Sequence, residues 1–159
     1  MSDDKRELLR HTIATVAYRG RKILIGAPDG FSTFRINETS RTPGEILAHI
    51  CDLYDWANSL ARGEPAFKQT EPAEWNADVA RFFAALKELD TYLASDKPLG
   101  RSPENLFQAP IADSLTHFGQ IAMLRRIAGA PVRGESYARA DITVGRVGLD
   151  QAPPNWEFD

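Results

Sequence analysis

Residues 42–62 read TPGEILAHICDLYDWANSLAR and decide the fold. Thr42, Pro43 and Glu45 fit an N-cap, the first helical position and the glutamate of a capping box, in which the two polar side chains satisfy each other's backbone N–H groups. Behind this start the apolar side chains recur at helical spacing, at Ile46, Ile50, Leu53, Ala57 and Leu60. The stretch therefore predicts a helix over 43–62 that buries one face.

Three further segments show helical rather than alternating periodicity, and proline and glycine separate them. We expect these helices at about 3–24, from just after 70–72 to near 95, and from about 102 to 128. Pro110 lies within the last segment and predicts an interruption there, because proline removes a backbone donor and clashes with the preceding turn. Gly129 and Pro131 then end the segment in the usual C-cap order.

Four amphipathic helices predict an all-α fold, a four-helix bundle in a single domain over 1–159. The connection over 25–42 is long for such a bundle, so it is either a crossover or an embellished end. The pattern changes after Pro131, and the alternation over 141–148 is compatible with an extended segment. We expect residues from about 131 to 159 to form an extended C-terminal tail packed on the bundle.

The composition, the net charge and the single cysteine exclude several classes of protein. The chain has 159 residues, 43% hydrophobic and 26% charged, and its net charge of -3 gives no cationic field for nucleic acid. Cys51 is the only cysteine, which excludes an intrachain disulfide framework and a multi-cysteine metal site. No stretch resembles a signal peptide or approaches the ~18 apolar residues of a membrane span. We therefore expect a cytoplasmic protein that binds neither nucleic acid nor a membrane.

Two of the three histidines occupy positions where chemistry is expected. His49 lies on the apolar stripe of the helix over 43–62, and His117 lies in the middle of the last helix. Asp113 precedes His117 by four residues, so both side chains leave the same helical face about 5 to 6 Å apart. Imidazole and carboxylate both bind zinc, nickel, iron or manganese, and two histidines with one carboxylate leave positions open for water or substrate. The spacing thus predicts a catalytic metal site at His49, Asp113 and His117.

The same residues also have a structural interpretation. A histidine on an apolar face, like His49, is often a hydrogen-bonded core residue. Asp113 and His117 can form a simple intrahelical pair, with Asp113 stabilised by the helix dipole. Spacing alone leaves both interpretations open.

Four other residues are weaker candidates for a functional role. Glu45 lies one turn before His49 and can serve as an acid or base, although its capping role already explains it. Trp56 lies on the same side of the helix and is either the wall of a pocket or a packing residue. Cys51 points away from His49 and is expected to be a small buried hydrophobe. His11 is expected to be a surface or packing residue.

Two segments resemble the signature segments of the DinB/YfiT-like superfamily of metalloenzymes. They are TPGEILAHI at 42–50, followed by Trp56, and DSLTHFGQI at 113–121. In that family a histidine of the second helix and an H-x-x-x-H pair of the last helix bind a divalent metal, and the second histidine of the pair stands just before Gly-Gln. The resemblance assigns the first ligand to His49 and the last to His117. It places Asp113 where the family usually has histidine.

The resemblance also implies an activity and a cofactor. It implies a DinB-type bundle that holds nickel, zinc, iron or manganese. Some members use a low-molecular-weight thiol, such as mycothiol, bacillithiol or glutathione, so the chain is expected to be a thiol-dependent S-transferase or a hydrolase that acts on a small-molecule substrate. Members are often homodimers. The alternative left open is a metal-free helical module that binds a ligand or dimerises without catalysis.

Overall fold

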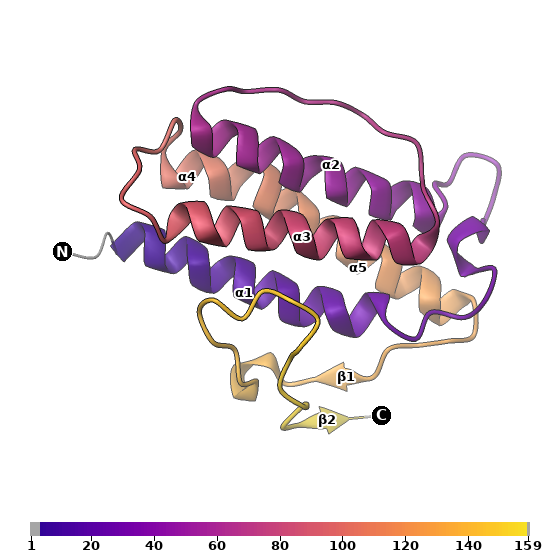
Figure 1. Ribbon diagram of the computed structural model, residues 1–159. Coiled ribbons are helices and arrows are strands. Elements are labelled where there is room, and N and C mark those ends of the chain that lie inside the picture. Colours follow the sequence, from indigo (N-terminus) through magenta and orange to yellow (C-terminus); the bar gives the residue numbers. More distant parts are fainter. Residues whose placement is uncertain (1–3, 159) are drawn as a thin grey trace.

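The computed structural model describes residues 4–158 and is mostly helical, as the periodicity predicts (Figure 1). Its helices are α1 (Asp4–Leu24), α2 (Pro43–Arg62), α3 (Trp75–Leu93), α4 (Pro103–Leu106) and α5 (Ala112–Ile127). The predicted bounds of 43–62 for the second helix agree with the observed ones, because both ends carry strong signals. Thr42 and Glu45 form the complete capping box, and Gly63 closes the helix in the left-handed conformation with a φ of 79°.

Pro110 interrupts the last helical segment, as predicted. The five residues Phe107–Ile111 form one wide π-helical turn between α4 and α5. A proline without an N–H cannot continue the regular ladder, and a π turn absorbs the extra residue and changes the direction in which the following side chains point. The break therefore sets the face that α5 presents to its neighbours.

The long connections follow from the arrangement of the helices. α1 packs against α3 and α5, and α2 packs against the same two helices, so α1 and α2 occupy opposite corners of the bundle. The connection over 25–42 is thus a crossover between diagonal corners, and it also carries the short 3-10 helix Phe31–Thr33.

A second long connection joins α2 to α3, which run in the same direction. The two helices start side by side, with an ideal Cβ on Gly44 only 3.6 Å from Pro72. Near their other ends Arg62 Nη2 lies 2.6 Å from Glu88 Oε1. The loop over 63–74 must therefore return along the whole length of α2, as Figure 1 shows. Twelve extended residues reach about 40 Å, enough to pass a 20-residue helix of about 30 Å.

The core lies where the helices meet. Phe82 of α3 is fully buried and contacts Tyr54 of α2 and Phe118 of α5 edge-on, with ring centroids 5.6 and 5.2 Å apart. Gly20 brings α1 close to these rings, because a Cβ there would lie 3.0 Å from both Phe82 and Phe118. The aromatic cluster fixes the spacing of the helices that carry the site.

The segment after α5 crosses the outside of α1 and ends in a two-stranded antiparallel sheet. Its strands are β1 (Gly134–Glu135) and β2 (Glu157–Phe158), with Gly134 opposite Phe158. The alternating stretch over 141–148 forms no strand, and its chain turns at Gly145, where φ is 88°. The alternation there has no partner strand to pair with, so it does not produce a strand.

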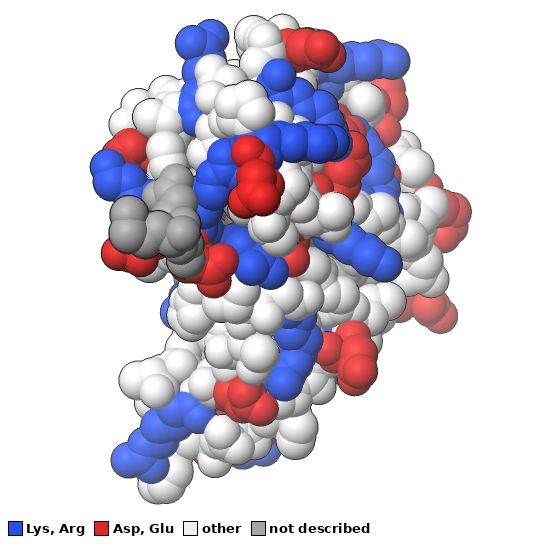
Figure 2. Space-filling model, turned by 60° about the vertical axis from the view of Figure 1, so that its left-hand side comes forward, with Lys and Arg blue, Asp and Glu red and all other residues white. Residues whose placement is uncertain are grey.

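Charge is mixed on the surface. Over the face shown in Figure 2, basic and acidic side chains are interspersed. Among the described residues, no helix combines the length and the hydropathy needed to cross a membrane.

Candidate metal centre

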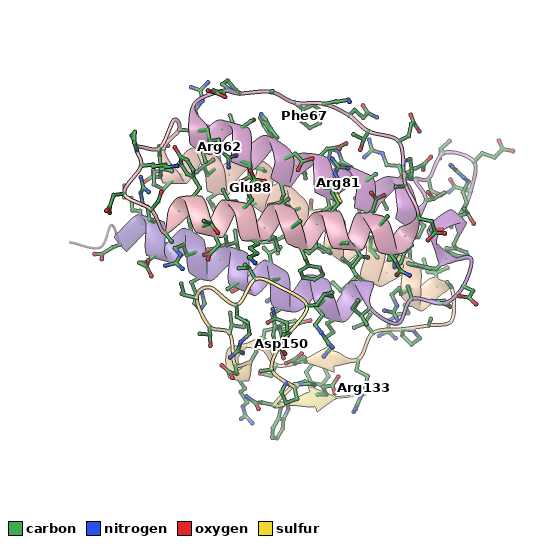
Figure 3. The ribbon with its side chains drawn as sticks, viewed as in Figure 1. Arg62, Phe67, Arg81, Glu88, Arg133 and Asp150 are labelled. Carbon is green, nitrogen blue, oxygen red and sulfur yellow. The ribbon has the colours of Figure 1, made fainter. Side chains whose placement is uncertain are left out.

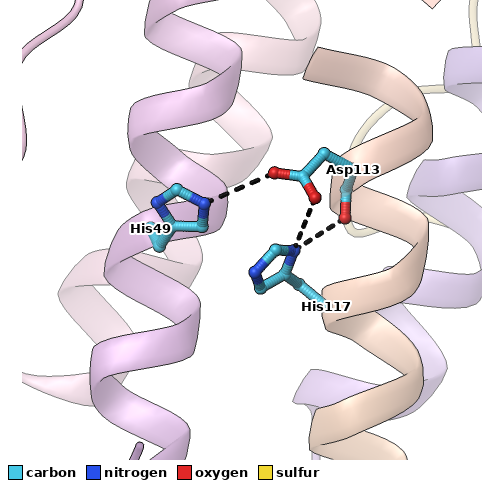
Figure 4. Close-up of side chains that lie close together, drawn as sticks. All are labelled: His49, Asp113 and His117. Atoms are coloured by element: carbon cyan, nitrogen blue, oxygen red, sulfur yellow. Dashed lines mark hydrogen bonds and ion pairs between the residues drawn. The ribbon is translucent and has the colours of Figure 1, made fainter. Parts of the chain in front are cut away.

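The three candidate ligands come together between two helices, as Figure 4 shows. His49 projects from α2, and Asp113 and His117 project from successive turns of α5. One potential ligand atom of each residue lies within 4.8 Å of the other two. Asp113 is central, with Oδ2 at 3.5 Å from His49 Nε2 and Oδ1 at 3.4 Å from His117 Nδ1.

A buried hydrogen bond holds the two helices in register beside this cluster. Tyr54 Oη of α2 and Ser114 Oγ of α5 are 2.7 Å apart, and Ser114 also donates to the carbonyl of Ile111 at 2.7 Å. Ser114 directly follows Asp113 in the first turn of α5. The position of Asp113 is therefore tied to α2 through its neighbour.

The tautomer of His117 follows from its backbone partner. His117 Nδ1 lies 2.7 Å from the carbonyl oxygen of Asp113. A carbonyl oxygen can only accept, so Nδ1 carries the proton and donates it. The neutral ring then has its free lone pair on Nε2, and this hydrogen bond is the kind that orients histidines in metal sites.

The cluster is open to solvent on one side. The exposed fractions of the side chains are 23% for His49, 45% for Asp113 and 13% for His117. Partial burial restrains the two imidazoles, and the more exposed carboxylate leaves the site accessible to small molecules. Such a site can leave coordination positions free for a reactant.

Phe67 packs against the His49 side of the cluster from the loop over 63–74, which passes over α2 in Figure 3. Its ring meets His49 edge-on with centroids 6.4 Å apart, and it meets Trp56 in the same manner at 5.8 Å. Trp56 is half-buried and contributes to this aromatic wall through Phe67. Phe67 has no periodic neighbours in the sequence, so no pattern there indicated its role.

A buried carboxylate anchors the loop that carries Phe67. Asp52 accepts hydrogen bonds from the backbone N–H of Thr70 at 2.9 Å and from the Thr70 hydroxyl at 2.7 Å. Arg81 of α3 donates to the same carboxylate at 2.8 Å and to Asp55 at 2.6 Å. Burial opposes the charge of Arg81, but its hydrogen bonds to Asp55 and Asp52 outweigh burial and raise its pKa. The loop is thus held to both α2 and α3 by charged hydrogen bonds.

Glu45 is engaged in holding the start of α2. The backbone N–H of Thr42 donates to Glu45 Oε2 at 2.7 Å, and Arg35 Nη2 lies 3.4 Å from Oε1. The hydrogen bond from Thr42 and the charge of Arg35 lower the pKa of Glu45. The capping interpretation is confirmed, and a carboxylate kept ionised in this way is a poor proton donor.

Two other predictions for single residues are also confirmed. Cys51 is fully buried, its thiol donates to the carbonyl of Asp78 at 3.3 Å, and burial raises its pKa. It therefore behaves as a small core residue rather than a nucleophile. His11 lies on the exposed side of α1.

Comparison with family models, with curated proteins and with solved structures gives no match for this chain.

Proposed function

We propose that this chain is a metal-dependent enzyme of the DinB-like type, in which His49, Asp113 and His117 hold one divalent cation. The observation that carries the proposal is the convergence of three ligand atoms from two helices within 4.8 Å at a solvent-accessible position. The proposed activity is transfer of a low-molecular-weight thiol or hydrolysis, with thiol or water as the nucleophile.

The distance between Asp113 and His49 favours a shared cation over a direct ion pair. Charge-assisted hydrogen bonds are about 2.7 to 2.9 Å long, whereas Asp113 Oδ2 lies 3.5 Å from His49 Nε2. Ligand atoms about 2.0 to 2.1 Å from a tetrahedral ion lie roughly 3.4 Å apart. The separation of Asp113 and His49 therefore fits a cation between them better than a bond between them.

Each residue has a defined task in this proposal. His49 and His117 supply neutral nitrogens, and Asp113 supplies the negative charge that offsets part of the charge of the ion. The Asp113 carbonyl orients His117, and the aromatic wall of Phe67 and Trp56 restricts water on one side. A bound divalent cation would lower the pKa of a water molecule or a thiol and so provide a nucleophile at neutral pH.

Elemental analysis tests the metal. Untagged protein is purified without chelator and analysed by plasma mass spectrometry beside His49→Ala, Asp113→Asn and the control His11→Ala. We expect close to one equivalent of nickel, zinc, iron or manganese in the parent and in the control. We expect at least tenfold less in the two site variants, because each loses a ligand.

The outcome separates the enzyme from the metal-free module. A parent that contains no metal and also takes up none of the four ions when they are added would contradict the proposal. Circular dichroism checks that the variants remain folded, which we expect because all three substituted side chains are partly exposed. Loss of metal from a folded variant is then due to the missing ligand.

The reaction is tested after the metal is established. Metal-loaded protein is offered a thiol with an alkyl halide, and separately an ester. S-transfer forms a carbon–sulfur bond, expels halide and releases the thiol proton, whereas hydrolysis yields acid and alcohol. We expect turnover of one pair by the parent and none by His49→Ala.

A further inference from the structure

Two hollows border the candidate metal centre, one at His117 and the other at His49, and they differ in character. The first, of about 730 Å³, contains His117, and its lining surface is mainly apolar, with contributions from Ile36, Ile46, Met123 and Leu124. We name it the apolar arm. The second, of about 420 Å³, contains His49 and is lined mainly by polar side chains, among them Arg35, Glu45, Asp52, Gln69, Thr70 and Glu71. We name it the polar arm. Ser40 and Arg41 line both arms.

Large apolar side chains in the apolar arm are exposed to solvent rather than buried in the core. Met123 is 58% exposed and Ile36 is 50% exposed, although both lie in a concave surface. Concave apolar surface with a few polar groups is typical of small-molecule sites, and methionine adapts to ligands of varied shape. Gly119 keeps the arm open, because a Cβ built there meets no atom within 4 Å.

Most charges of the polar arm are already paired. Glu45 is held by Arg35 and the N-terminus of α2, and Asp52 is held by Thr70 and Arg81. Arg41 is exposed, and within residues 4–158 no carboxylate or carbonyl pairs with its guanidinium. Glu71 lines the polar arm but not the apolar arm. Arg41 lines both arms, so the unpaired charge at their junction is its positive guanidinium.

We infer that the substrate is amphiphilic: its apolar group fills the apolar arm beside His117, and its anionic group pairs with Arg41 at the junction. The placing of the reacting group between these two ends rests on the proposed function. The two contacts themselves need no metal. Arg41 is thus a positioning residue, suited to a carboxylate or phosphate because its planar fork offers two parallel donors.

Three probe compounds test this inference without knowledge of the natural substrate. Octanoate carries both an apolar chain and an anion, 1-octanol carries the chain alone, and acetate carries the anion alone. We titrate each into the protein in the presence of Zn²⁺ by calorimetry. We expect octanoate to bind at least about tenfold more tightly than either of the other two, because it makes both contacts.

Two variants assign the contacts to residues. Arg41→Gln is expected to reduce octanoate affinity about tenfold, to the level of octanol, while the matched surface variant Arg101→Gln leaves it unchanged. Gly119→Leu fills open space on a helix where leucine is the better helix former, so the fold is retained. It is expected to weaken octanoate and octanol about tenfold and to leave acetate unaffected.

The failure of this inference is distinguishable from failure of the proposed function. Octanoate that binds no better than acetate or octanol, or equal effects of the two arginine variants, would overturn the amphiphilic substrate even in a protein that takes up metal. Octanoate binding that depends on Arg41 in a parent that takes up no metal would support the two arms and overturn the metal enzyme. His49→Ala separates the cases further, because it removes a ligand and leaves Arg41 and the apolar arm intact.

Discussion

Asp113 has two functions at the site, one through its backbone carbonyl and one through its side chain. Through its backbone it fixes the ring of His117 with Nδ1 protonated, and through its carboxylate it stands between both histidines. An aspartate is shorter than the histidine expected at this position from the DinB-like resemblance, and it brings a negative charge. In the proposed metal site, that charge would favour harder divalent ions such as manganese or iron relative to an all-imidazole set.

At the residue scale, Tyr54→Phe tests the bond that holds Asp113 in register. Its loss is expected to cost about 1 kcal/mol, because Ser114 keeps its second partner, the carbonyl of Ile111. Burial raises the pKa of Tyr54, so the folded protein keeps a proton that the unfolded chain releases above about pH 10. The parent therefore loses stability as pH rises beyond 10, by about 1.4 kcal/mol per pH unit for this group.

The phenylalanine variant lacks this titration and is expected to show a shallower alkaline loss. Urea unfolding at pH 8, 10 and 11 measures both effects. Tyr18 and Cys51, whose pKa values burial also raises, keep part of the slope in the variant. Equal slopes for parent and variant would contradict the assignment of a buried phenol to Tyr54.

At the element scale, α5 supplies the cap of α1. The guanidinium of Arg125 donates to the carbonyls of Ile23, Ile25 and Gly26 at 2.9 to 3.0 Å and to Ala130 at 3.0 Å. Arg125 is only 7% exposed, and burial lowers its pKa. A cation at the negative end of the α1 dipole satisfies carbonyls that the helix leaves unpaired. The cap pins the C-terminal ends of two parallel helices together.

Arg125→Met is expected to destabilise the fold by about 3 kcal/mol, because four carbonyls lose their donor inside the protein. Arg125→Lys is expected to have a smaller cost than Arg125→Met, because an ammonium reaches some but not all of the four carbonyls. The neighbouring exposed Arg126→Met is the matched control and is expected to stay within about 0.5 kcal/mol of the parent. Urea unfolding monitored by circular dichroism gives the three values. A cost for Arg125→Met no larger than the control would show that water replaces the cap.

At the scale of the whole molecule, the tail docks on α1 through a buried carboxylate. The side chain of Glu135 is fully buried; it accepts from the hydroxyl of Tyr18 and lies 2.7 Å from Lys22 Nζ, which also binds Glu157 at 3.0 Å. Burial opposes the charge of Lys22, but Glu135 and Glu157 outweigh it and raise its pKa. The cluster lies on α1, whereas His49 lies on α2 in the opposite corner of the bundle.

Glu135→Gln is therefore expected to lower stability by about 2 kcal/mol while metal content stays at the parent's level. The amide keeps the shape but loses the charge that Lys22 faces. Thermal unfolding and elemental analysis of the same preparation measure the two effects. Asp150→Asn, on the exposed part of the tail, serves as the control (Figure 3). Loss of metal in Glu135→Gln would mean that the tail supports the site, contrary to the separation of the two regions.

The sequence by itself determined the helices and the identity of the three candidate ligands. Capping, periodicity and the break at Pro110 depend on neighbours within a few residues, so they can be recognised without the fold. The i, i+4 spacing of Asp113 and His117 is local in the same sense.

Only the tertiary structure decided what lies around these ligands. The approach of His49 to Asp113 requires the packing of α2 against α5, and the aromatic wall requires a loop that returns along α2. Phe67 and Arg125 have no sequence pattern, because their partners are distant in the chain and meet them only when the bundle closes. Arg41 has none either, because the two hollows that it lines exist only in the packed bundle. The choice between the two interpretations of the first long connection was also nonlocal, since it depended on which helices occupy neighbouring corners. Local signals specify elements, whereas contacts between distant segments are fixed by packing, and packing is a property of the whole chain.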